Sequence, residues 1–114
     1  TLILQASVVV LPYDSKDQVT SGVLVDSVAT GRPIVATAFP HAVELLGSGA
    51  GLVVPHDDPD ALVSALKRVL TDPRAAGSMA SEARELAPTM AWPVVADAYL
   101  ALARRLVAAR LAVA

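Results

Sequence analysis

Small polar residues stand at the start of a predicted helix, where an anion could bind. Thr20, Ser21 and Gly22 come directly before an apolar helical segment that runs to Thr30. Ser21 is a good N-cap because its hydroxyl can accept an N–H of the first turn, and Gly22 has no Cβ to keep a phosphate at a distance. Free N–H groups and the positive end of the helix dipole favour negative charge at such a position. We therefore expect this helix start to bind an anion such as a phosphate group.

Two predicted strands flank this helix. Residues 7–11 (SVVVL) form an unbroken apolar run of the kind found in strands that are covered on both faces, and residues 34–37 (IVAT) form the second strand. Gly31 can adopt the left-handed conformation that ends a helix. Strand, helix and strand predict a βαβ unit with a right-handed crossover. The polar loop over residues 13–19 then lies at the carboxyl end of the first strand, where open α/β sheets bind ligands.

A short helix, a third strand and two longer helices are predicted to follow. Residues 41–46 predict the short helix and residues 52–54 the strand. Aspartate followed by proline is a strong helix start signal, and it occurs at residues 58–59 and again at 72–73. The pattern predicts an α/β fold, a Rossmann-like three-layer parallel sheet with C-terminal helices. Three strands are few for such a sheet, so its edges need cover from residues outside this sequence or from a second copy.

The last predicted helix runs from about residue 91 to beyond residue 110. Its apolar residues recur at three- and four-residue steps, and they are Trp92, Val95, Tyr99, Leu102 and Leu106. We interpret Trp92 and Tyr99 as packing residues, not as substrate-stacking ones. This stripe must fold onto the domain or pair with another chain. Because only three strands are visible and the chain is 54% hydrophobic, with a mean hydropathy of +0.55, we predict a homodimer.

Composition excludes several classes of protein. A chain of 114 residues suits one small domain. Its basic residues are few and scattered, which does not favour nucleic-acid binding. The chain has no cysteine, so disulfides and cysteine metal clusters are excluded, and we expect no metal and no cofactor. No apolar run of about 18 residues and no signal peptide are visible, so we expect no membrane span and a cytoplasmic location.

At residues 18–37, QVTSGVLVDSVATGRPIVAT, the chain resembles the retaining GT-B glycosyltransferases of the large group 1 family. The flanking segments ASVVVLPY, FPHAVELL and GSGAGLVVPHDDPDALVSAL agree with that family's pattern. The resemblance covers nearly the whole chain. It implies that residues 1–114 are the second half of a C-terminal, nucleotide-sugar-binding Rossmann-like domain, a partial GT-B domain. The start at Thr1, without a methionine, fits our expectation of a fragment.

The resemblance also implies which residues bind the donor. The loop and helix start that cradle the donor diphosphate in the family correspond here to Thr20, Ser21, Gly22, Val23 and Leu24. A carboxylate inside the helix contacts the ribose hydroxyls, and the matching residue is Asp26, which is shorter than the family's usual glutamate. The family's other glutamate, eight residues earlier, binds the donor sugar. Gln18 stands there, and it can hydrogen-bond to sugar hydroxyls without carrying a charge.

The resemblance implies a hexosyltransferase-type enzyme that transfers a sugar from a UDP- or GDP-sugar to an unidentified acceptor with retention of configuration. The family's basic diphosphate ligands and its N-terminal domain would precede Thr1, so no catalytic residue is assigned here and the isolated chain is expected to be inactive. Two alternatives stay open, a non-catalytic nucleotide- or phosphate-binding module and an oligomerisation module. A fingerprint G-x-G-x-x-G is absent after the first strand, which argues against NAD.

A purely structural interpretation is also open for several of these residues. An N-cap and a tight turn would account for Ser21 and Gly22 without any ligand. We interpret His41 as a residue that caps the short helix or packs against the loop, not as an acid–base group. Gln18 could likewise be an ordinary loop residue.

Overall fold

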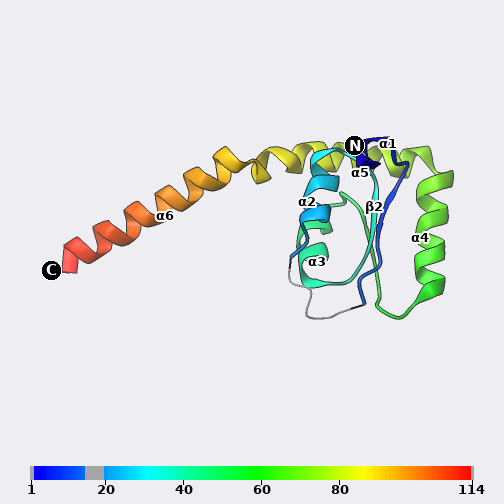
Figure 1. Cartoon of the computed structure of the whole chain (residues 1–114), viewed down its shortest axis with the longest axis horizontal. Helices are drawn as coiled ribbons and strands as arrows, with labels where there is room; N and C mark the ends of the chain where they lie inside the picture. Colours follow the sequence, from blue (N-terminus) through cyan, green and yellow to red (C-terminus); the bar gives the residue numbers. More distant parts are fainter. Residues whose placement is uncertain (1, 15–19, 114) are drawn as a thin grey trace.

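Three parallel strands form the centre of the computed structural model, which describes residues 2–14 and 20–113 (Figure 1). The strands are β1 (Val9–Leu11), β2 (Ile34–Thr37) and β3 (Leu52–Val54), in the spatial order β1-β2-β3. All pairs are parallel, with Val9 opposite Ile34 and Val35 opposite Leu52. The predicted parallel α/β fold is therefore confirmed, and β2 and β3 have the predicted bounds.

The first strand is shorter than the predicted 7–11. Val9 is the first residue whose N–H joins the ladder, by donating to the carbonyl of Pro33 at 2.9 Å. Ser7 before it is exposed. A short helix, α1 (Leu2–Gln5), precedes the strand, as expected for residues 1–6. Within the described residues β1 and β3 each pair with one strand only, so both edges of the sheet are open.

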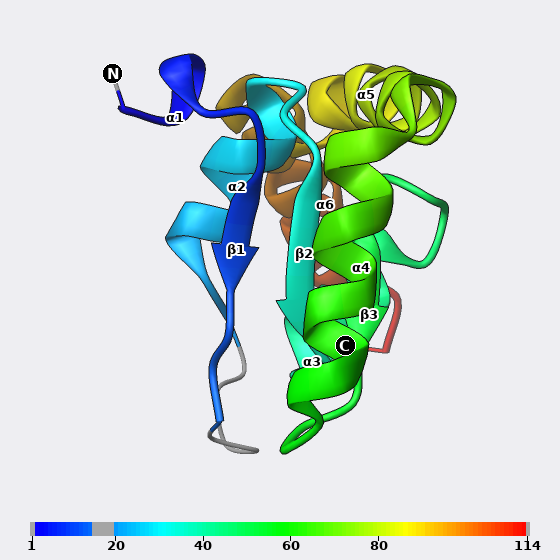
Figure 2. The same cartoon turned by 90° about the vertical axis from the view of Figure 1, so that its right-hand side faces the viewer.

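Helices cover both faces of the sheet. The helices α2 (Gly22–Ala29) and α3 (Pro40–Leu46) lie on one face and α4 (Pro59–Thr71) lies on the other (Figure 2). A further helix, α5 (Pro73–Leu86), crosses the edge at which the strands begin (Figure 2). Loops and the starts of α2 and α4 lie at the opposite edge, where the strands end.

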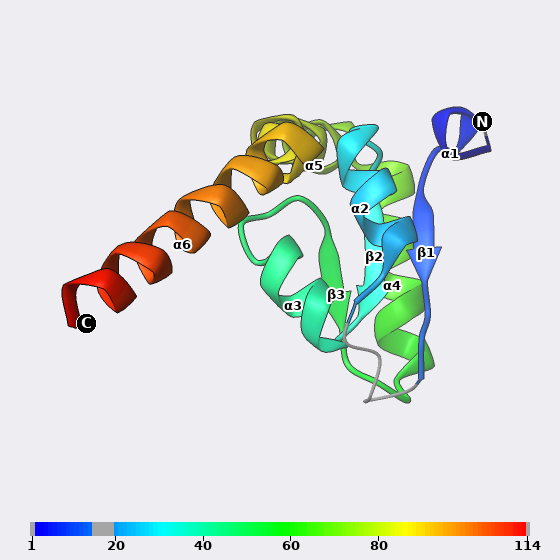
Figure 3. The same cartoon turned by 60° about the vertical axis from the view of Figure 1, so that its left-hand side comes forward.

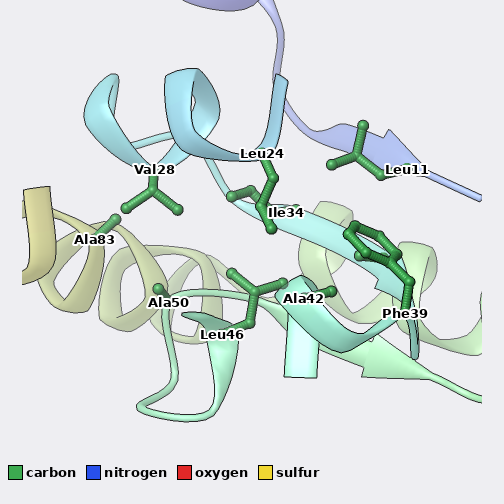
Figure 4. Close-up of a cluster of buried hydrophobic side chains, with 10 residues drawn as sticks. Leu11, Leu24, Val28, Ile34, Phe39, Ala42, Leu46, Ala50 and Ala83 are labelled. Atoms are coloured by element: carbon green, nitrogen blue, oxygen red, sulfur yellow. The ribbon is translucent and has the colours of Figure 1, made fainter. Parts of the chain in front are cut away.

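Each face of the sheet has its own hydrophobic core. The larger core is drawn in Figure 4, where Leu24 and Val28 of α2 meet Ile34 of β2 and Phe39. The smaller core lies under α4 and joins Val35, Val54, Ala65, Val69 and Met79. All four residues of β2 are buried, as its apolar sequence requires for a central parallel strand. The packing of Leu24 and Val28 against β2 holds α2, the helix that carries the candidate site, on the sheet.

Aspartates cap the starts of α4 and α5, as predicted. The Asp58 carboxylate accepts the N–H of Ala61 at 2.9 Å, and the Asp72 carboxylate accepts the N–H groups of Arg74 and Ala75, both at 3.1 Å. Each cap is followed by proline at the first helical position. The chain leaves α5 through a short 3₁₀ helix, η1 (Ala87–Met90).

The last helix, α6 (Trp92–Val113), projects away from the domain (Figures 1 and 3). It stretches the molecule to 61 Å along its longest axis, against 27 and 23 Å across. None of its side chains is buried, so the predicted stripe does not fold onto this domain. By length and composition, no single described helix can cross a membrane; only residues 73–90 taken together with α6, at a bend of 47°, meet those criteria.

Candidate functional site

Ser21 begins α2 in the manner predicted. Its backbone is extended, with φ −144° and ψ 117°. Its Oγ accepts the N–H of Leu24 at 3.2 Å, and the Tyr13 hydroxyl lies 3.2 Å from the same oxygen. The side chain is thus an N-cap and is also held by the loop that follows β1.

The backbone N–H of Ser21 donates to Nδ1 of His41 at 3.0 Å. Of the five amides at residues 20–24, those of Ser21 and Leu24 are therefore bonded within the protein. The N–H groups of Gly22 and Val23 have no acceptor among the described residues, and both residues are exposed. Helix geometry leaves the first N–H groups of a helix without intrahelical partners, so these two are the donors that α2 offers to a ligand.

Contacts between neighbouring loops hold this helix start in place. The Thr37 hydroxyl, at the end of β2, donates to the carbonyl of Tyr13. The Tyr13 ring packs against Phe39 with 5.0 Å between centroids, tilted by 53°. Phe39 is fully buried. The carboxyl ends of β1 and β2 thereby fix Tyr13, and Tyr13 in turn contacts the Ser21 cap.

A cavity of about 610 Å³ opens beside the exposed side of α2. Gly22 and Asp26 of α2 line it together with His41 of α3, and Trp92 and Tyr99 of α6 complete the far wall. Two of the predicted donor-binding residues, Gly22 and Asp26, therefore share one space. Asp26 is exposed and offers a carboxylate one helical turn away from the free amides.

The other predicted site residues contribute in different ways. The side chain of Leu24 is fully buried in the core, so only its backbone lies near the helix start. Thr20 is exposed just before Ser21, and Val23 is 44% exposed. Gln18 lies outside the described residues.

Sequence reasoning assigned no ligand role to His41, Trp92 or Tyr99, which also line this cavity. A signal for His41 was present, because it follows the carboxyl end of β2 as Ser21 follows that of β1, and parallel strands end at one edge. The two aromatic residues gave no such signal, since α6 is remote in sequence from α2.

A smaller cavity of about 200 Å³ opens elsewhere along the carboxyl edge of the sheet. Tyr13, Thr37, Asp57 and Leu62 are among the residues that line it. Within the described residues, no group of three His, Cys, Asp or Glu side chains could hold a metal ion. The larger cavity, with two free amides and a carboxylate, is the better candidate for a polar ligand.

Comparison with known proteins identifies related chains. Residues 1–72 match the family model described as Glycosyl transferases group 1. The chain is similar to UDP-N-acetylglucosamine--N-acetylmuramyl-(pentapeptide) pyrophosphoryl-undecaprenol N-acetylglucosamine transferases of Pseudomonas paraeruginosa and Pseudomonas aeruginosa, at 37% identity over 87 residues. That alignment covers 67% of this chain and 24% of each relative, so the chain spans about a quarter of their length.

The fold is similar to that of a solved enzyme. Sucrose-phosphate synthase from Thermosynechococcus elongatus superposes with a TM-score of 0.78 and 30% sequence identity, over 95% of this chain and 27% of that one. The match extends over the sheet and helices described above and agrees with the family model. The chain is therefore a member of the group 1 glycosyltransferase family, with the α/β architecture of part of a GT-B enzyme.

Proposed function

We propose that this chain is the donor-binding part of a glycosyltransferase that takes a sugar from a nucleotide-sugar donor. One observation carries the proposal: the free N–H groups of Gly22 and Val23 lie at the start of α2, beside a cavity of about 610 Å³ that Gly22 and Asp26 both line. Amides at a helix start suit a diphosphate. A carboxylate one turn further on suits the hydroxyls of a ribose.

We propose a role for each residue, supported by this geometry for residues 20–26 and by the resemblance of residues 18–37 for Gln18. The N–H groups of Gly22 and Val23 bind the diphosphate of the donor, while Thr20, Ser21 and Leu24 shape the loop that presents them. In this structure the amides of Ser21 and Leu24 are occupied by His41 and by the Ser21 hydroxyl. Asp26 binds the ribose, and Gln18 stays the proposed ligand of the donor sugar.

The Pseudomonas relatives are named for a UDP-linked sugar donor, which supports UDP over GDP as the first nucleotide to test. Retention of configuration is proposed from the resemblance of residues 18–37 alone. Catalysis would consist of stabilising the leaving diphosphate and positioning an acceptor. The domain that supplies the acceptor is proposed to belong to a longer chain, since the relatives are about four times as long as the matched segment.

Titration of the chain with UDP, followed by backbone amide NMR shifts, tests donor binding. We expect saturable shifts at residues 20–26, with those of Gly22 and Val23 the largest. Asp26→Asn should weaken the binding of UDP but leave the binding of pyrophosphate unaffected, because the contact to the ribose is lost and the contact to the phosphates is not. Asp97→Asn, a change of the same type on the projecting helix α6, is the matched control. Absence of shifts at millimolar UDP would remove the donor-binding proposal.

A second candidate role, self-association, rests on α6. Trp92 is 84% exposed, Tyr99 70% and Leu106 63%, and large apolar patches of this kind mark surfaces that another protein covers. We propose that the isolated chain forms a homodimer through this helix. The two surfaces meet at the base of α6, because Trp92 and Tyr99 of the stripe also line the cavity beside Gly22.

A further inference from the structure

His41 makes a hydrogen bond that determines which of its ring nitrogens carries a proton. Its Nδ1 accepts the backbone N–H of Ser21 at 3.0 Å, across 20 residues of sequence. Only a nitrogen without a proton can accept. The neutral ring must therefore carry its proton on Nε2, which makes Nε2–H a donor.

The ring that carries this donor belongs to a residue of the candidate site. His41 is half-buried and lines the same cavity as Gly22 and Asp26. Among the described residues, Nε2 has no hydrogen-bond partner. Water satisfies such a donor when the cavity is empty, and a ligand oxygen can replace that water without loss of the bond.

The charges around the cavity make this donor important. No lysine or arginine is among the described residues that line it, and Asp26 is the one formally charged group there. An anion in the cavity thus depends on N–H donors. Hydrogen bonds to charged acceptors are about twice as strong as neutral ones, so one additional N–H beside the amides of Gly22 and Val23 has a large effect.

We infer that His41 is a ligand-binding residue of this site, with Nδ1 holding the Ser21 amide and Nε2–H donating to a phosphate oxygen of the donor diphosphate. The inference rests on the proposed function. A phosphate is favoured over a sugar hydroxyl because the ring is bonded to Ser21, the residue next to the free amide of Gly22. His41 thereby links the loop after β2 to the helix that follows β1.

Two substitutions of His41 test the hydrogen bonds of its two ring nitrogens separately. In His41→Asn the side-chain Oδ1 is bonded to Cγ, as Nδ1 is, so the acceptor for Ser21 is kept while nothing replaces Nε2–H. In His41→Gln the amide nitrogen reaches further and supplies a donor, while the acceptor for Ser21 is lost. Val43→Ala, on the exposed side of the same helix and away from the cavity, is the matched control.

The test measures dissociation constants for pyrophosphate and for UDP by NMR, together with the ring nitrogen shifts of His41. We expect an unprotonated Nδ1 and a protonated Nε2 in the free chain, and a shift of Nε2 when either ligand is added. His41→Asn should weaken both ligands by roughly tenfold or more. His41→Gln should lose less affinity for the two ligands than His41→Asn. Val43→Ala should bind both ligands as tightly as the unmodified chain.

The outcomes distinguish the inference from the proposed function. If the unmodified chain binds UDP and His41→Asn binds it equally well, His41 is not a ligand and donor binding stands. A free chain with its proton on Nδ1 would also overturn the inference, whatever the affinity for UDP. If the unmodified chain binds neither pyrophosphate nor UDP, both the proposed function and the role of His41 are wrong.

Discussion

Individual glycines in this chain serve different physical needs, although their sequence contexts look alike. A Cβ added at Gly22 would meet no atom within 4 Å, and the same holds for Gly77 in α5. A Cβ at Gly51 would lie 2.7 Å from the carbonyl oxygen of Ile34. Gly31 has φ +71°, which other residues rarely adopt. The first two glycines are thus free of packing demands, whereas the last two are required by the fold.

Gly51→Ala is expected to destabilise the fold by about 2 kcal/mol, because the new methyl group overlaps a backbone atom of the central strand. Urea unfolding followed by circular dichroism measures the change. Gly77→Ala is the control, and it should stabilise the protein by up to about 1 kcal/mol through helix propensity. Equal stabilities for the two variants would show that residue 51 has room for a side chain.

Gly22→Ala is expected to weaken UDP binding without lowering stability. The methyl group fits sterically, but it stands beside the free amides and restricts the approach of a phosphate. Titration with UDP, alongside urea unfolding, separates the two effects, and Gly77→Ala again serves as the control. Unchanged affinity in Gly22→Ala would mean that the phosphates do not approach the start of α2.

At the scale of elements, the residues that cap the helices hold neighbouring segments in place. The cap of α2 joins three segments, since Ser21 contacts Tyr13 through its side chain and His41 through its backbone. The caps of α4 and α5 are simpler. Among the described residues, the carboxylates of Asp58 and Asp72 accept only from the first turns of their own helices, and the Asp72 N–H also donates to the carbonyl of Arg68 at the end of α4. The α2 cap therefore connects the candidate site to the fold, whereas the caps of α4 and α5 affect stability alone.

Asp72→Ala should therefore lower the free energy of unfolding by about 1 kcal/mol, the usual cost of losing an aspartate cap. UDP affinity should not change, because α5 lies at the opposite edge of the sheet from the start of α2 (Figure 2). Asp72→Asn retains a capping oxygen and should recover most of the stability. Chemical denaturation of the three proteins provides the comparison. A loss of UDP affinity in Asp72→Ala would contradict the separation of the two edges.

The whole molecule is a small domain with a long projecting helix. Residues 92, 95, 99, 102, 106, 109 and 113 follow alternating steps of three and four, and all are apolar. This spacing is the heptad pattern of helices that pack in pairs. None of the described stripe residues is buried, and only its first part, at Trp92, Val95 and Tyr99, borders the domain. Cover for the rest of the stripe must come from another chain or from residues beyond this sequence.

Leu106→Glu should abolish self-association of the isolated chain, because it places a charge in the centre of the stripe. Leu111→Glu is the matched control, since five residues further along an α-helix lie on a different face. Sedimentation velocity over a range of concentrations gives the oligomeric state of each variant. A monomeric unmodified chain at high concentration would exclude the homodimer.

The isolated chain should show no turnover of a UDP-sugar, because it spans about a quarter of the length of the relatives it matches. Release of UDP, measured with a coupled assay, is the readout. Binding of UDP without turnover is the expected combination. Turnover by the purified 114-residue chain would show that the acceptor and the catalytic groups are already present in it.

Local patterns in the sequence predicted most of the elements and their order. Apolar runs predicted β2 and β3 to the residue, the Asp–Pro pairs predicted the starts of α4 and α5, and Ser21 was correctly predicted as an N-cap. These features depend on a few neighbouring residues, through backbone conformation and local hydrogen bonds. The motif over residues 18–37 also indicated the family, which the family model confirms.

Only the tertiary structure decided which groups share the cavity and which amides are free. His41 reaches Ser21 because two parallel strands end at the same edge of the sheet. Trp92 lines the same cavity as Gly22 because α5 and η1 pack against α2. Whether the apolar stripe of α6 packs on its own domain was likewise decided in three dimensions. Such contacts depend on the distances between residues far apart in sequence, and no periodicity along the chain encodes them.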